Sequence, residues 1–168
     1  MATAVSAGGL YALLDRNDSA HAAAVAALAG AGGPLLLITP VLAEGMRLAE
    51  RFLGREAALM LLESAIRSEV LVQPTDKRDL AYAAGLLRAQ PGLSLSGALT
   101  VALAKRLGAE AVLCLESALR EAATREGLQV LPDAGPAPVE ATSAEGTAVA
   151  APSAEGDSPQ GATGEAAP

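Results

Sequence analysis

Cysteine, tryptophan and other aromatic residues are scarce in this chain of 168 residues. Its single cysteine, Cys114, excludes an internal disulfide and a cysteine-rich zinc site. There is no tryptophan, and the aromatic residues are Tyr11, Phe52 and Tyr82. No stretch reaches the run of about 18 apolar residues that a membrane span needs. The N-terminus also lacks the basic region of a signal peptide, so we expect a reducing, cytoplasmic setting without a membrane.

Basic residues are absent from the C-terminal part of the chain. Residues 134–168 contain five acids, no Lys or Arg, and only Val139 and Val149 as branched aliphatic residues. A segment of this composition buries too little apolar surface to offset the entropy lost on ordering, so we predict a disordered acidic tail. Residues 1–133 contain fourteen acids, twelve bases and nearly all the large aliphatic residues, and they are expected to form one domain.

The charge balance excludes one class of protein. A net charge of −7 does not suit a protein that coats nucleic acid nonspecifically, because such proteins rely on a strongly basic surface. The near-neutral balance of residues 1–133 still allows an enzyme that meets RNA through a local patch.

Short apolar runs alternate with helical patterns along residues 1–133. The runs predict five strands, at 3–5, 34–39, 69–74, 111–115 and 128–132. The helical patterns cover about 19–29 (with Asp18 as N-cap), 40–52, 55–68, 75–88, 94–108 and 116–126. Apolar strands that alternate with helices predict an α/β fold with a parallel sheet covered on both faces.

Ligands bind such sheets beyond the carboxyl ends of the strands, near the point where the strand order reverses. The candidate residues just past strands are Ser6, the segment 39–44, which ends at Glu44, and Glu116. Gly97, in "SLSGALTVALA" (94–104), begins a predicted helix that could face the same rim. Glycine is unexpected there, because it costs about 1 kcal/mol relative to alanine in a helix. First-turn positions instead favour carboxylates.

Four stretches of residues 1–133 resemble the PIN-domain family, in particular the VapC-like toxins of bacterial toxin–antitoxin pairs. They are "GGLYALLDRNDSAH" (8–21), "ITPVLAEGMRL" (38–48), "LSLSGALTVALAKRLGAEAVLCLESAL" (93–119) and "LQVLP" (128–132). The third is the most specific, since its helix, strand and acid follow one another at the family's spacing. The resemblance implies a PIN-like three-layer fold with a parallel five-stranded sheet.

The resemblance also implies endoribonuclease activity that depends on Mg²⁺ or Mn²⁺. Mg²⁺ prefers oxygen ligands, activates water and neutralises the charge that develops during phosphodiester hydrolysis. Matched position by position, the family's four acidic positions fall on Ser6, Glu44, Gly97 and Glu116. Two of them lack a carboxylate, and Glu116 is one methylene longer than aspartate.

We therefore expect a weak metal site at Glu44 and Glu116 and a nuclease activity that is impaired or lost. Removing ligands that also orient the attacking water commonly costs orders of magnitude in rate. The alternatives are an active but weak metal-dependent ribonuclease and a non-catalytic module that binds RNA or protein. A second copy of the chain and a small antitoxin are the partners that the resemblance implies.

Structural roles compete with functional ones at these positions. Ser6 could be the N-cap of the following segment, and Glu116 a first-turn acid of the helix it starts. Glu44 could be a solvated helix residue. For Gly97, the competing interpretation is an irregular helix entry.

Three other features have structural interpretations that we favour. His21, the single histidine, is expected to pack or to hydrogen-bond at a helix start rather than to act as a base. Cys114 is expected in the core. Arg47, Arg51 and Arg55 recur every four residues and are expected to form a solvated stripe rather than an RNA contact.

Overall fold

The computed structural model describes residues 1–133, and the predicted tail, residues 134–168, lies outside the described residues. The strands are β1 (Thr3–Val5), β2 (Leu35–Ile38), β3 (Val70–Gln73), β4 (Ala111–Leu113) and β5 (Gln129–Leu131). They form one parallel sheet in the order β3-β2-β1-β4-β5. The five predicted strands are therefore confirmed.

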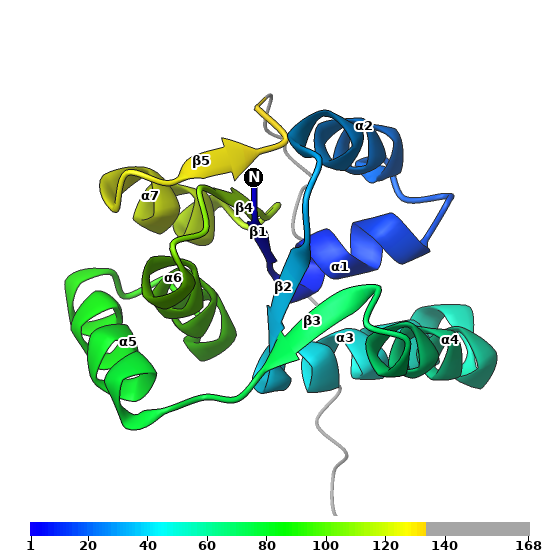
Figure 1. The fold of residues 1–168 in the computed structure, drawn as a ribbon, viewed down its shortest axis with the longest axis horizontal. Coiled ribbons are helices and arrows are strands. Elements are labelled where there is room, and N and C mark those ends of the chain that lie inside the picture. Colours follow the sequence, from blue (N-terminus) through cyan, green and yellow to red (C-terminus); the bar gives the residue numbers. More distant parts are fainter. Residues whose placement is uncertain (134–168) are drawn as a thin grey trace, which may run out of the picture.

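Helices cover both faces of this sheet (Figure 1). They are α1 (Ala7–Leu14), α2 (His21–Ala31), α3 (Thr39–Leu53), α4 (Arg55–Ile66), α5 (Lys77–Ala89), α6 (Leu95–Leu107) and α7 (Ser117–Arg125). Helices α1–α4 lie on one side and α5–α7 on the other (Figure 1). This arrangement confirms the predicted three-layer α/β fold.

The strand order reverses beside β1. The chain passes from β1 through β2 to β3 at one edge, and then returns to pair β4 with the other side of β1. At the carboxyl end of this pair, the backbone N–H of Ser6 donates to the carbonyl oxygen of Leu113 at 3.0 Å. The residues that follow β1 and β4 thus meet at the position where doubly wound sheets bind their ligands.

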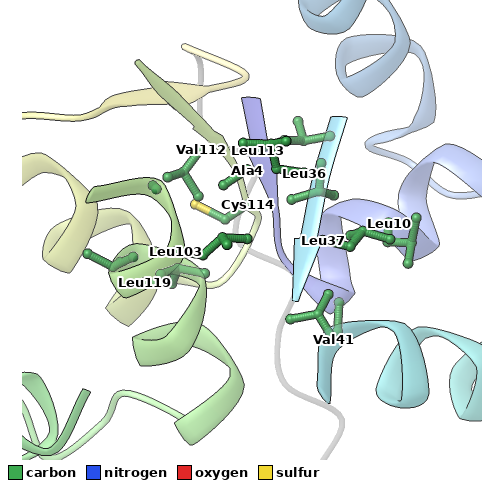
Figure 2. Close-up of a cluster of buried hydrophobic side chains, with 14 of the residues drawn as sticks. Ala4, Leu10, Leu36, Leu37, Val41, Leu103, Val112, Leu113, Cys114 and Leu119 are labelled. Carbon is green, nitrogen blue, oxygen red and sulfur yellow. The ribbon is translucent and has the colours of Figure 1, made fainter. Parts of the chain in front are cut away.

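Buried aliphatic side chains fill both interfaces between sheet and helices. Figure 2 shows Leu103 of α6 and Leu119 of α7 beside Cys114, and Leu10 of α1 near Leu37 of β2. Helix α6 is buried at every residue from Gly97 to Ala104, because it lies between the sheet and α5. Cys114 is fully buried, as predicted.

Two helix predictions need correction. Helix α2 begins at His21 rather than near Ser19, and Asp18 is not its N-cap. The Asp18 side chain instead accepts a hydrogen bond of 2.7 Å from the N–H of Ala20, which forms a turn before the helix. The sequence also gave no prediction of α1, since its glycines lower helix propensity.

Candidate functional site

Ser6 directly follows β1 and is the N-cap of α1. Its Oγ accepts a hydrogen bond of 3.0 Å from the N–H of Gly9, and the residue is only 2% exposed. The hydroxyl therefore satisfies one of the free amide groups at the helix start. The structural role that the sequence allowed for Ser6 is the one observed.

Glu116 is the N-cap residue of α7, but its side chain makes no capping hydrogen bond to that helix. The carboxylate reaches the start of α1 instead. Its Oε2 accepts from Ser6 Oγ at 2.9 Å and from the N–H of Leu115 at 3.1 Å, while Oε1 accepts from the N–H of Gly8 at 3.1 Å. The carboxylate lies where the α1 dipole stabilises negative charge. Glu116 thus supports the first helix rather than the one it starts.

Gly8 and Gly9 make this arrangement possible, and the sequence analysis assigned them no role. A Cβ on Gly8 would lie 2.6 Å from Glu116 Oε1, so any larger residue would displace the carboxylate. A Cβ on Gly9 would lie 2.6 Å from the carbonyl oxygen of Leu113, which is backbone. The signal in the sequence was the pair of glycines immediately after a strand, which marks a close backbone approach.

Gly97 is the third residue of α6, where its N–H donates to the Oγ of the N-cap Ser94 at 3.1 Å. A Cβ at this position would lie 3.1 Å from Ser94 Oγ and 3.2 Å from Leu93 Cδ1. Both neighbours would have to move by a few tenths of an ångström to accept a side chain. Glycine therefore fits closely at position 97, and the first carbon of any side chain would crowd Ser94 and Leu93.

Glu44 lies half-buried on α3. The next residue, Gly45, faces α1, since a Cβ there would lie 2.6 Å from Leu10 Cδ2. Glu44 is thus on the helix that packs against α1, but it is not part of the hydrogen-bonded group of Ser6, Gly8 and Glu116. Within residues 1–133, no group of three or more His, Cys, Asp or Glu residues is placed to hold a metal ion.

The residues present do not fit the four-acid metal site that the PIN resemblance implies. Mg²⁺ requires oxygen ligands in near-octahedral geometry. Position 97 has no side chain, and the Ser6 hydroxyl is engaged with Gly9 and Glu116. Both carboxylate oxygens of Glu116 already accept hydrogen bonds. Of the four positions, Ser6 and Glu116 therefore already have hydrogen-bond partners, and position 97 has no side chain that could bind a metal ion.

The arginines of α3 and α4 are part of a solvent-facing surface. Arg55 lies 3.3 Å from Glu50 in an exposed ion pair, and the Arg51 guanidinium lies 5.1 Å from the centre of the Phe52 ring. These contacts agree with the predicted solvated stripe.

His21 begins α2, and its Nδ1 lies 2.8 Å from the carbonyl oxygen of Ala12. This hydrogen bond ties the start of α2 to α1, in agreement with the structural role that the sequence favoured.

Comparison with known families identifies the fold. The family model described as "PIN domain" matches residues 9–124, so the chain belongs to the PIN-domain family. A comparison with curated protein sequences finds no match.

Two solved structures are similar in fold. One is VapC20 of Mycobacterium tuberculosis, described as a toxin that cleaves the sarcin–ricin loop. It is 20% identical with a TM-score of 0.64, over 71% of this chain and 94% of that chain. The other is VapBC2 of Rickettsia felis, bound to a DNA fragment from its promoter. It is 13% identical with a TM-score of 0.56, over 77% of this chain and 97% of that chain.

These likenesses show a VapC-like fold.

None of the helices within residues 1–133 has the length and apolar character needed to cross a membrane.

Proposed function

We propose that this chain is a cytoplasmic, VapC-like PIN-domain protein whose ribonuclease activity is lost or strongly reduced, and that it binds RNA without cleaving it. The observation that supports the loss of activity is the hydrogen bond between Ser6 Oγ and Glu116 Oε2, and RNA binding is proposed by analogy with the family. Two of the family's acidic positions meet beyond β1 and β4. Ser6 supplies a neutral hydroxyl donor at one of them, and Glu116 supplies the carboxylate that accepts from it at the other.

The Glu116 carboxylate is stabilised at this point by hydrogen bonds from neutral groups. Two carboxylates facing each other repel, and a bound metal relieves that repulsion. Here a single carboxylate is stabilised by one hydroxyl and two backbone N–H groups. Hydrogen bonds to a charged group are among the stronger ones in proteins. The local fold therefore gains little from Mg²⁺ or Mn²⁺.

A second candidate function is a weak metal-dependent ribonuclease. Glu116 is exposed to solvent and Glu44 is half-buried, so each carboxylate is accessible to solvent. Mg²⁺ retains several water ligands and is often bound through only one or two carboxylates. In this alternative Glu44 and Glu116 would be the residues that hold the ion, which would supply activation of water for hydrolysis.

The fold neighbours suggest partners to propose for this chain. VapBC2 of Rickettsia felis was solved on a DNA fragment from its promoter, and VapC20 is described as a toxin that cleaves an RNA loop. By analogy, we propose that this chain also associates with a small antitoxin-like protein and with a second copy of itself.

The test is a cleavage assay on the full chain with mixed RNA in Mg²⁺ or Mn²⁺, with EDTA as the blank. A matched variant carries Ser6→Asp, Gly97→Asp and Glu116→Asp. We expect cleavage by this restored variant alone. If the native chain cleaves with metal and Glu44→Gln abolishes the cleavage, the weak ribonuclease is the correct function. If the restored variant is folded and inactive, the assignment of the four positions is wrong.

A further inference from the structure

The chain leaves the described fold at Asp133, which follows the last strand of the sheet. All five strands are parallel, so the residues after Leu131 begin at the carboxyl edge, where Ser6 and Glu116 also lie. We propose that the carboxylates of residues 134–168 weaken RNA binding at this edge by repelling the phosphates. This inference rests on the RNA binding proposed above and adds its regulation.

Arg120 of α7 fixes the point at which the chain leaves the sheet. Its Nη2 donates to the carbonyl oxygens of Pro132 at 3.0 Å and Asp133 at 3.4 Å, and its Nη1 donates to the carbonyl oxygen of Cys114 at 3.1 Å. Cys114 ends the buried run of β4, two residues before Glu116. The last described residues are therefore tied to the segment that carries Glu116.

Arg120 also lies one helical turn after Glu116. Its backbone N–H donates to the Glu116 carbonyl oxygen at 3.0 Å, within the first turn of α7. One half-buried guanidinium thus connects α7, the end of β4 and the residues after β5. Strand β5 pairs with β4 at one edge of the sheet (Figure 1). Residues 134–168 therefore start beside the candidate site, whatever direction they take from there.

The charge of residues 134–168 has one sign. They contain no Lys or Arg, and they account for five of the seven net negative charges of the chain. Their acids are Glu140, Glu145, Glu155, Asp157 and Glu165. RNA has one negative charge per phosphate, so these carboxylates oppose its approach. The repulsion is screened beyond a Debye length of about 10 Å at 0.1 M salt, so it requires carboxylates close to the bound RNA.

The distance from Asp133 along the chain separates the five acids into near and far groups. Glu140 is seven residues after Asp133, and an extended chain spans at most about 3.6 Å per residue, so the two residues lie within about 25 Å of each other. Glu165 is 32 residues after Asp133, and the same limit is about 115 Å. The repulsion should therefore depend on where a carboxylate lies along the chain as well as on net charge.

The experiment measures binding of a short, fluorescein-labelled RNA of mixed sequence to the full chain. Fluorescence anisotropy is recorded in EDTA, so that no cleavage contributes. The variant carries Glu140→Gln, Glu145→Gln, Glu155→Gln, Asp157→Asn and Glu165→Gln. We expect its affinity to exceed that of the native chain by about threefold or more at low salt, and the gain to disappear at high salt, where the Debye length is a few ångströms.

Two double variants with the same charge change are matched controls for each other. Glu140→Gln/Glu145→Gln removes two carboxylates near Asp133, and Glu155→Gln/Glu165→Gln removes two that are further along the chain. We expect the first pair to give most of the gain in affinity and the second pair to give little. None of these substitutions lies within residues 1–133, and circular-dichroism melts should give the native Tm for every variant.

The outcomes separate this inference from the proposed function on which it rests. If the native chain and the variant with five substitutions bind RNA equally well at low salt, the regulation is wrong and the RNA binding stands. If neither binds, the proposed RNA binding is wrong, and the inference fails with it. Equal gains from the two double variants would mean that only net charge matters, and would overturn the role of the point at which the chain leaves the sheet.

Discussion

The Ser6 hydroxyl donates a hydrogen bond of 2.9 Å to the Glu116 carboxylate, and so joins two residues that are 110 positions apart in the sequence. It links the carboxyl ends of β1 and β4, the two strands between which the sheet order reverses. In the PIN resemblance both positions carry acidic ligands of one metal site. In this chain they bind each other.

This hydrogen bond predicts energetic coupling between the two residues. Ser6→Ala and Glu116→Gln should each lower the free energy of unfolding, and their combined effect should be smaller than the sum by about 1 kcal/mol, the usual net value of such a bond. Urea unfolding of the two single variants and the double variant measures the coupling. Strictly additive effects would mean that the contact contributes nothing.

Gly8→Ala tests the position of the Glu116 carboxylate without changing either partner. Alanine raises helix propensity by up to about 1 kcal/mol, but its Cβ would come within 2.6 Å of Glu116 Oε1 and displace the carboxylate. We expect no gain in stability in the native background and a gain in a Glu116→Ala background. Gly30→Ala in α2, where a Cβ meets nothing within 4 Å, is the control and should stabilise in both.

Gly9→Ala should be the more damaging of the two neighbouring substitutions. The added Cβ would lie 2.6 Å from the backbone oxygen of Leu113, which cannot move aside as a side chain can. Overpacking of this kind typically costs about 1–3 kcal/mol. Thermal unfolding should show a clearly lower Tm than for Gly8→Ala. A Tm equal to that of the native chain would contradict the close approach of α1 to β4.

Metal ions should distinguish the native chain from the restored variant in stability as well as in activity. The native Tm should be unchanged between EDTA and millimolar Mg²⁺ or Mn²⁺, because the site is satisfied by hydrogen bonds. The variant Ser6→Asp/Gly97→Asp/Glu116→Asp should be less stable in EDTA. Metal at 100 times its Kd should stabilise that variant by about 2.7 kcal/mol. A metal-dependent rise in the native Tm would favour the weak ribonuclease.

Cys114 should make the protein sensitive to alkaline pH. Burial, with the nearby Glu116 charge, raises the pKa of its thiol from 9.0 to about 12. The folded state therefore keeps the proton more firmly than the unfolded state. The resulting stability is complete below pH 9 and is lost as the pH rises toward 12. Urea unfolding at pH 8 and pH 10 should show a decrease that is smaller in Cys114→Ala. The native thiol should also resist a thiol-specific reagent at pH 8 and react once urea unfolds the chain.

Much of the fold follows from local patterns. The apolar run at Leu35–Ile38 is a buried strand as predicted. Asp76 caps α5 with Asp79 as its capping-box partner, and Gly108 ends α6 in the left-handed conformation with φ of 63°. Each of these signals lies within a few residues of the helix end or strand that it determines. They can therefore be recognised from one sequence without knowledge of distant contacts.

The parts that sequence analysis missed depend on distant contacts. Helix α1 contains Gly8 and Gly9, which are poor helix formers, and the packing of Gly9 against Leu113 decides its structure instead. The role of Glu116 could not be predicted from its neighbours, because its binding partners belong to the first helix. Position 97 was recognised as unusual, but the small space beside it is visible only once Leu93 and Ser94 are in place.

The Ser6–Glu116 contact also affects which single substitutions could lead from this sequence to one with acids at all four positions. Ser6→Asp as a first step places a second carboxylate against Glu116, and Gly97→Asp as a first step crowds Leu93 and Ser94. We expect each such intermediate to be less stable than the present chain, and each still lacks a complete set of acids. Selection on folding alone would therefore disfavour both of these first steps toward a four-acid site.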